Sequence, residues 1–205
     1  MNNPAPNSSA HSALPVTHPE NFPVASWLCP PHLRNAIAAL YAFARAADDI
    51  ADEGDHPAET RLKALANFRN ALWRQPGSEK FEPQIFMPLQ AVIEEKQLPV
   101  KLLDDLLKAF EQDIQASASG HQSQNLNELL TYCERSANPV GRLLLHLYGV
   151  QDDAALVRSD AICSALQLIN FWQDLSEDIP RGRFYLPQDM QAHMAPDELI
   201  QALCR

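Results

Sequence analysis

The sequence predicts an all-α protein built around one folded domain. Hydrophobic residues make up 46% of the 205 residues, Ala and Leu are abundant, and there are only six glycines. Runs of β-branched residues are few, and this composition favours helices over strands. Apolar residues also recur at helical spacing in segments that Pro and Gly separate. A chain of this length can bury a substantial core.

The N-terminal part is predicted to be a disordered tail followed by a helix. Residues 1–20 carry Pro, Asn, Ser and Ala without periodicity, which leaves the domain over residues 21–205. Pro30-Pro31 begins a helix, because Pro is favoured in the first helical turn. We expect this helix to reach about residue 53, where a turn containing Gly and Pro ends it.

Three more helices are predicted in the middle of the chain from their apolar spacing and their Pro and Gly boundaries. We expect them over residues 58–75, 83–97 and 99–115. The apolar stripe of the first consists of Leu62, Leu65, Phe68, Leu72 and Trp73.

The remaining elements alternate with turn signals. Asn125 is expected to cap a helix reaching about Ala137, with Glu128 at capping-box spacing. Pro139 then begins a new helix, or kinks the existing one, up to Gly149. We further expect a polar loop over 116–124, a long helix over 153–178, a loop over 179–189 and a last helix from about Pro196.

The net charge of −10 limits the classes of partner. Sequence-independent binding of nucleic acid needs a basic surface, so no nucleic-acid partner is expected. No signal peptide and no apolar run of about 18 residues is visible in the sequence. We therefore expect a cytoplasmic protein, and peripheral association with the inner face of the membrane stays open.

The four cysteines are scattered, without CxxC or zinc-finger spacing. Reduced cysteines in the core of a cytosolic protein are the favoured interpretation. They are Cys29, Cys133, Cys163 and Cys204.

Two aspartate pairs lie within apolar, helix-patterned segments. Asp48 and Asp52 are four residues apart, as are Asp174 and Asp178. Such residues share one helix face, where like charges repel. A hard cation would offset this repulsion, and oxygen ligands without histidine favour Mg²⁺. Two such pairs facing each other would hold a diphosphate between them.

Acidic residues on solvated helix faces are common and usually carry no function. Asp104 and Glu111, for example, are expected to be surface charges. The two aspartate pairs differ because apolar residues surround them, and charges in such surroundings are rarely buried unless paired or bound to metal.

Polar residues near the pairs have two interpretations each. Arg45 either neutralises Asp48, three residues further on, or contacts a phosphate. Asn170 and Gln173 either contact diphosphate and metal-bound water or form a polar pair in the core. Arg181, in the loop after the second pair, suits an anion-binding lid or is an exposed charge.

A second group of candidates follows the predicted helix cap. Tyr132 is either a buried tyrosine with one hydrogen-bond partner or a polar group in an apolar cavity. Ala137 and Gly141 are small residues at helical spacing. They allow either close contact between helices or room for a long ligand.

Together these residues resemble the squalene/phytoene synthase family. The matching segments are residues 21–53, 132–141 and 167–187. The most specific motifs are Asp-Asp-Ile-Ala-Asp and Asn-Phe-Trp-Gln-Asp-Leu-Ser-Glu-Asp-Ile-Pro-Arg-Gly-Arg-Phe-Tyr-Leu-Pro. Glu-Asn-Phe-Pro-Val-Ala-Ser, near the start, is most similar to members of the bacterial hopanoid pathway.

This resemblance implies an all-α terpenoid-synthase fold around a central apolar cavity. It also implies Mg²⁺-dependent conversion of presqualene diphosphate to hydroxysqualene, with squalene or phytoene synthesis from two prenyl diphosphates as the alternative. The implied metal ligands are Asp48, Asp52, Asn170, Asp174 and Asp178. The implied substrate-binding residues are Phe22, Tyr41, Arg45, Asn170, Gln173 and Arg181, and the implied catalytic residues are the four aspartates and Tyr132.

Two features depart from the family pattern. His18-Pro-Glu-Asn21 replaces the Ser or Lys residues that often precede the phenylalanine matching Phe22. Family members are also usually longer by several C-terminal helices, so we expect those helices to be missing here.

Two rival hypotheses remain. One is a non-catalytic relative acting as an assembly protein, which the four aspartates disfavour. The other is a di-iron protein, which would need Glu-x-x-His motifs. The sequence does not indicate whether the protein is a monomer or an oligomer.

Overall fold

The computed structural model describes residues 29–52, 56–181 and 185–191, and these contain helices and no strand. The all-α prediction is therefore confirmed. The tail over 1–20 and the helix expected from Pro196 lie outside the described residues. The elements are η1 (Pro31–Leu33), α1 (Arg34–Asp52), α2 (Ala58–Leu72), α3 (Pro83–Lys96), α4 (Val100–Ser119), α5 (Leu126–Ser136), α6 (Asn138–Leu147), α7 (Asp153–Gln173), α8 (Leu175–Asp178), η2 (Ile179–Arg181) and η3 (Gln188–Met190).

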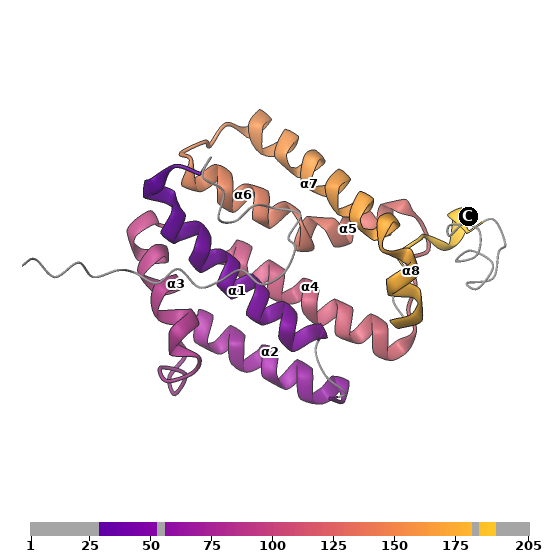
Figure 1. The fold of residues 1–205 in the computed structure, drawn as a ribbon, viewed down its shortest axis with the longest axis horizontal. Coiled ribbons are helices and arrows are strands. Elements are labelled where there is room, and N and C mark those ends of the chain that lie inside the picture. Colours follow the sequence, from indigo (N-terminus) through magenta and orange to yellow (C-terminus); the bar gives the residue numbers. More distant parts are fainter. Residues whose placement is uncertain (1–28, 53–55, 182–184, 192–205) are drawn as a thin grey trace, which may run out of the picture.

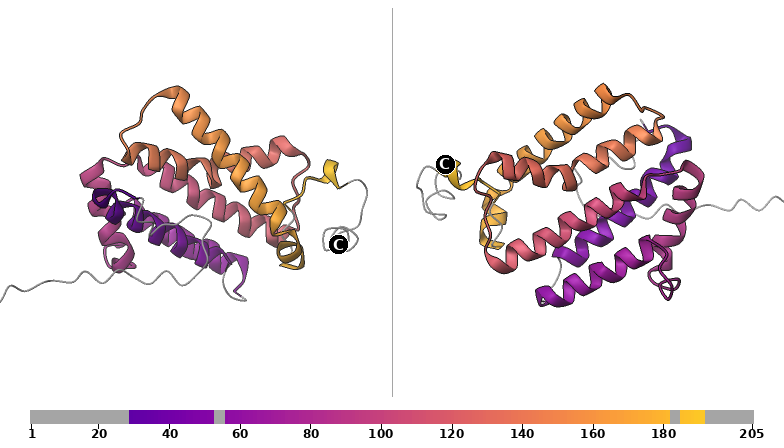
Figure 2. Two further views of the ribbon diagram at one scale, coloured as in Figure 1. Left: turned by 45° about the horizontal axis from the view of Figure 1, so that its top comes forward. Right: turned by 180° about the vertical axis from the view of Figure 1, so that it is seen from behind.

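Helix α4 occupies the centre of the bundle. It packs against α1 and α2 and also against α5 and α6. Helix α3 packs on α1, while α7 packs on α5 and α6 at the edge opposite α2 and α3 (Figure 1). Helices α1 and α7 run towards the same end of the bundle in each view (Figure 2). Helix α1, which carries the first aspartate pair, and helix α7, which ends just before the second pair, therefore end on the same side of the molecule.

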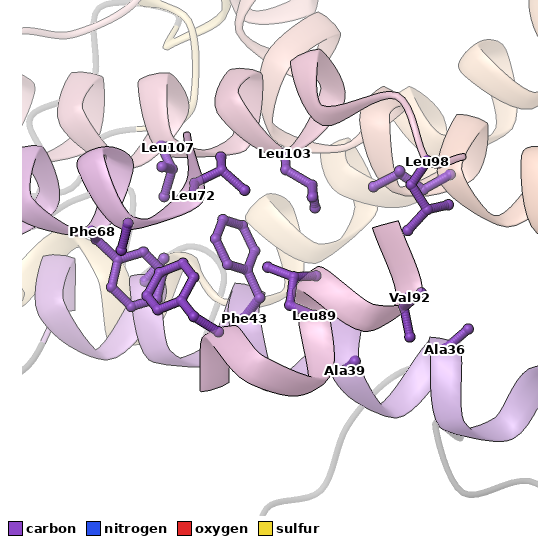
Figure 3. Packing of buried hydrophobic residues seen from close by; sticks show 14 of the residues in the cluster. Ala36, Ala39, Phe43, Phe68, Leu72, Leu89, Val92, Leu98, Leu103 and Leu107 are labelled. Carbon is purple, nitrogen blue, oxygen red and sulfur yellow. The ribbon is translucent and has the colours of Figure 1, made fainter. Parts of the chain in front are cut away.

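Aromatic side chains from three helices form the centre of the larger core. The ring of Phe43 in α1 lies 5.2 Å from that of Phe68 in α2. The ring of Phe86 in α3 lies 4.7 Å from Phe68. Leu103 and Leu107 of α4 close this cluster (Figure 3). Buried aromatic pairs of this kind add about 0.5–1.5 kcal/mol each beyond the burial of apolar area.

The predicted apolar stripe of α2 is partly buried at Leu62, buried in its middle and exposed at its end. Leu65, Phe68 and Leu72 lie in the core, but Trp73 is 45% exposed. Its indole N–H donates a hydrogen bond to Asp104, 3.3 Å away. The prediction that Asp104 is a surface charge is wrong, because this carboxylate is only 7% exposed.

Two helix ends differ from their predictions in detail. Helix α4 extends to Ser119, past the predicted end at residue 115, because the stop signal is Gly120, with a φ of 68°. At the start of α5, Asn125 Oδ1 accepts from Glu128 N–H at 3.0 Å, as predicted. The Glu128 carboxylate closes the cap one residue early, by accepting from Gln124 N–H at 2.7 Å.

Candidate functional site

The first aspartate pair lies in the last turns of α1, whose buried face is rich in alanine. Asp48 is half-buried and Asp52 is exposed. Arg45 Nη1 lies 3.2 Å from Asp48 Oδ2, and Arg45 Nη2 lies 2.8 Å from Asp49 Oδ1. Arg45 therefore neutralises Asp48, the first of its two interpretations. Its side chain remains 34% exposed, so the guanidinium can also meet a phosphate.

The second pair does not lie on one helix, which corrects the prediction of a continuous helix over 153–178. Helix α7 ends at Gln173, and Asp174 has φ −96° and ψ 8°, outside the helical region. Aspartate is a poor residue for a helix interior because its side chain competes for backbone groups. Pro180 then prevents extension of α8, because it lacks the N–H that a helix requires. The expected loop over 179–189 likewise contains η2 and η3.

The break gives the two aspartates different surroundings. Asp174 is exposed, whereas Asp178 is only 9% exposed. The backbone N–H of Asp174 still donates to Asn170 O at 3.0 Å, and that of Asp178 donates to Asp174 O at 2.8 Å. Asn170 is half-buried one turn before Asp174, and Gln173 is exposed at the end of α7.

No closed metal site is formed by the part of the chain that the structure describes. Within it, no three His, Cys, Asp or Glu side chains come together as metal ligands. The donors of the two pairs are all carboxylate oxygens, which fit Mg²⁺. This ion is usually held by one or two carboxylates and completes its shell with water and phosphate. Each pair could therefore contribute to a Mg²⁺ site that a diphosphate completes.

Tyr132 of α5 is buried and has the hydrogen-bond partner that a buried tyrosine requires. Its hydroxyl donates to Asp113 Oδ2 of α4 at 2.8 Å. Burial, and next the charge of Asp113, raise the pKa of Tyr132 well above its usual range. The phenol therefore stays protonated at neutral pH.

Asp113 was not among the sequence candidates, although its position carried a signal. It follows Leu106 by seven residues and Ala109 by four, so it shares their helix face. Both of those residues are buried. An acidic residue in line with a buried apolar stripe needs a polar partner.

An aromatic group surrounds Tyr132. The rings of Phe171 in α7 and Tyr185 stack at 3.8 Å with an interplanar angle of 5°. Their centroids lie 5.9 Å and 6.3 Å from that of Tyr132. With Ala109 and Leu129, these rings belong to a second, smaller apolar cluster. Phe171 directly follows Asn170, so this cluster adjoins the second aspartate pair along α7.

The segment that carries Tyr185 is attached to the connection between α4 and α5. The backbone N–H of Gln188 donates to Ser123 O at 2.9 Å, and that of Asp189 donates to Gln124 O at 3.2 Å. The side chain of Arg181 and all of Phe22 lie outside the described residues, so their predicted roles remain predictions. Tyr41 of α1 is half-buried.

Among the glycines that the structure describes, Gly141 of α6 has a neighbouring helix, α7, in the space that a side chain would occupy. A Cβ at this position would lie 2.4 Å from Ser159 Oγ and 2.6 Å from Cys163 Sγ. Close helix contact, the first of the two interpretations, is therefore observed. Asn138 of α6 also accepts a hydrogen bond at 3.0 Å from the Ser164 hydroxyl of α7.

Among the described cysteines, Cys133 is buried in the core, whereas Cys29 and Cys163 are only partly buried. Cys29, Cys133 and Cys163 are free thiols, and burial raises the pKa of Cys133 to about 11. Cys204 lies outside the described residues. Among the helices of the described part, none combines the length and the apolarity needed to cross a bilayer.

Comparison with known proteins gives consistent matches. The sequence profile of squalene/phytoene synthases matches residues 16–203. Hydroxysqualene synthase of Rhodopseudomonas palustris is 36% identical over 172 residues, covering 83% of this chain and 56% of that protein. Phytoene synthase of Cereibacter sphaeroides is 33% identical over 175 residues, covering 82% and 48%. The chain thus spans about half the length of these curated relatives.

The fold is also similar to that of a solved structure. The crystal structure of squalene synthase HpnC from Alicyclobacillus acidocaldarius matches with a TM-score of 0.75 and 35% identity. The match covers 90% of this chain and 68% of that one.

Proposed function

The chain belongs to the squalene/phytoene synthase family, and from this membership we propose that it takes part in converting presqualene diphosphate to hydroxysqualene, with Mg²⁺ as cofactor. Similarity to a hydroxysqualene synthase supports the choice of product. The observation that carries the proposal is the presence of both aspartate pairs, the first in the last turns of α1 and the second directly after α7, two helices that end on the same side of the bundle. The chain spans about half the length of its curated relatives, so the activity named for them is a proposal here.

The aspartate pairs are the proposed ligands for the metal. Asp48 and Asp52 would hold it from α1, and Asp174 and Asp178 would hold it from the end of α7 and from α8. Mg²⁺ bound there would neutralise the charge that develops on the departing diphosphate. Asn170, one turn before Asp174, would contribute a neutral oxygen ligand.

Arg45 is proposed to bind the diphosphate directly. Its guanidinium already contacts two carboxylates, Asp48 and Asp49, and is partly exposed. A planar guanidinium can form paired hydrogen bonds to phosphate oxygens, and this would place the diphosphate beside the α1 pair.

The aromatic cluster is proposed to surround the reacting hydrocarbon. Loss of diphosphate leaves a carbocation, which water captures to give the hydroxyl group of the product. The rings of Tyr132, Phe171 and Tyr185 would limit water near that cation until it has rearranged. Their faces would also favour positive charge.

A second candidate is the joining of two prenyl diphosphates head to head. Similarity to a phytoene synthase supports it, and it would use the same aspartate pairs. The substrate that the protein accepts separates the two reactions.

The test is incubation of the purified chain with presqualene diphosphate and Mg²⁺, followed by mass analysis of the lipid extract. EDTA provides the control, and parallel samples contain either farnesyl diphosphate with NADPH, the hydride donor that squalene formation consumes, or geranylgeranyl diphosphate. We expect hydroxysqualene only with presqualene diphosphate and Mg²⁺. Failure of a folded chain to convert presqualene diphosphate, or equal conversion with EDTA, would contradict the proposal. Squalene or phytoene products would favour the second candidate.

A further inference from the structure

The hydrogen bond between Asp113 and Tyr132 places a charged group at the edge of the aromatic cluster. Asp113 is half-buried in α4, and its Oδ2 accepts from the Tyr132 hydroxyl at 2.8 Å. Tyr132 is only 9% exposed, and the remaining members of the cluster are apolar or aromatic. A carboxylate in such surroundings acts more strongly on its neighbours than one in water.

The direction of this hydrogen bond determines what the phenol can do. Because its proton is donated to Asp113, the Tyr132 oxygen keeps its lone pairs free of that bond. A hydrogen bond to a charged acceptor also increases the partial negative charge on the donor oxygen. The carboxylate fixes the rotation of the hydroxyl and therefore the direction of the lone pairs.

We infer that Asp113 is a positioning residue for the proposed reaction: it orients and polarises the Tyr132 phenol, whose oxygen then stabilises a cationic carbon of the hydrocarbon chain. This inference rests on the proposed function. No proton is transferred, because the raised pKa of Tyr132 keeps the phenol neutral. Asp113 acts through Tyr132 and does not itself contact the substrate.

The contact between Tyr132 and Phe171 links the polarised phenol to the helix that precedes the second aspartate pair. Phe171, whose ring lies 5.9 Å from that of Tyr132, is three residues before Asp174 on the same helix. A diphosphate held at Asp174 would therefore begin about one helical turn from the ring that packs on Tyr132. The carbon that loses diphosphate would form close to the polarised oxygen.

The test compares Asp113→Asn with the matched control Asp105→Asn. Both remove one negative charge from α4, but Asp105 pairs with Lys101 and Lys108 rather than with Tyr132. With presqualene diphosphate and Mg²⁺, we expect Asp113→Asn to lower kcat by about 10–100-fold with KM within about twofold. Asp105→Asn should leave both constants unchanged. Asp113→Glu, which keeps the carboxylate, should recover part of the kcat.

Two further measurements separate positioning from a purely structural role. The variant Asp113→Asn/Tyr132→Phe should be no slower than Tyr132→Phe alone, because both changes remove the same interaction. In protein labelled at the ζ carbon of tyrosine, Asp113→Asn should shift the NMR signal of Tyr132. The Tyr132→Phe variant assigns that signal.

The outcomes distinguish this inference from the proposed function. If the wild-type chain converts the substrate and Asp113→Asn matches Asp105→Asn in kcat, the inference is wrong and the proposed function stands. Equal loss of kcat and of thermal stability in Asp113→Asn and Asp113→Glu would show a structural role and would also overturn the inference. If the folded wild-type chain converts no presqualene diphosphate, the proposed function fails and the inference fails with it.

Discussion

The carboxylates of this protein have two kinds of partner. Some are proposed to bind a metal ion, and others form ion pairs with Arg or Lys side chains of the protein. Asp104 of α4 belongs to the second group. Its oxygens accept from Arg69 Nε at 2.8 Å and pair with Lys108 Nζ at 2.8 Å. Burial alone would raise the pKa of Asp104, but hydrogen bonds from Lys108, Trp73 and Arg69 outweigh it and lower that pKa. This network joins α2 to α4.

Asp104→Asn should lower the free energy of unfolding by about 1.5–3 kcal/mol at pH 7, because hydrogen bonds to charged groups contribute that much. The folded pKa of Asp104 is depressed, so its contribution is present above the unfolded pKa of about 3.9 and is lost as pH falls through the folded pKa. Urea unfolding at pH 7 and in acid measures this. Asp105→Asn, which removes a partner of exposed Lys101, should cost less than about 1 kcal/mol. A pH-independent difference between wild type and Asp104→Asn would contradict the expectation.

Asp48→Asn and Asp174→Asn should each lower turnover of presqualene diphosphate by about 10²–10³-fold, because each removes a proposed ligand of the Mg²⁺ that would stabilise the departing diphosphate. Asp48 is half-buried and Asp174 is exposed, so the fold should be retained. Steady-state kinetics measures the loss of turnover, and circular dichroism checks that the fold is retained. Asp153→Asn, at an exposed acid in the first turn of α7, is the control and should keep full activity. Retained activity in either site variant would refute the metal-cluster proposal.

At the scale of elements, the contact between α6 and α7 depends on one small residue. Ser159 and Cys163 of α7 lie where a side chain at Gly141 would have to go. An Arg142–Asp160 ion pair, with Nη2 and Oδ2 2.6 Å apart, joins the same two helices. The spacing between α6 and α7 is therefore fixed by packing and by charge.

Gly141→Ala should destabilise the protein by about 1–3 kcal/mol, the usual cost of overpacking. Ser159 and Cys163 are short side chains that could rotate away, so the lower part of this range is expected. Thermal or urea unfolding measures the change. Adding Ser159→Ala and Cys163→Ala should recover stability relative to Gly141→Ala alone, since both clashing atoms are removed. Purely additive effects of the three substitutions would show that the clash is absent.

Most helix boundaries could be predicted because local residues set them. Pro30-Pro31, Pro99 and Asn125 begin helices close to where their chemistry requires. The break at Asp174 was missed because the apolar spacing continues across it, while the backbone conformation changes at one residue. The Asp104–Arg69 and Asp113–Tyr132 contacts were missed for another reason. Each joins residues from different helices, and no local pattern specifies that pairing.

At the scale of the molecule, α7 presents several exposed hydrophobic side chains on its side of the bundle. Among the residues that the structure describes in α7, only Phe171 is buried. Exposed hydrophobic side chains on this helix include Val157 at 66% and Ile162 at 60%. The other exposed hydrophobic residues of α7 are Leu166, Ile169 and Trp172.

Val157→Ser and Ile162→Ser should each change the free energy of unfolding by no more than about 0.5 kcal/mol, as exposed positions do. Leu103→Ala, in the core between α1 and α4, should cost about 2–5 kcal/mol. Urea unfolding of the full chain provides both values. A cost of 1 kcal/mol or more at Val157 or Ile162 would mean that these side chains are covered in solution.

The non-helical backbone at Asp174 has a consequence for the spacing within each aspartate pair. Asp48 and Asp52 lie on one continuous helix, so the separation of their backbones follows from the regular rise and rotation of α1. Asp174 departs from helical φ and ψ, although its N–H and its C=O still form hydrogen bonds to Asn170 and Asp178. The separation within the second pair therefore depends on the backbone conformation of one residue, whereas that within the first pair follows from helix geometry alone.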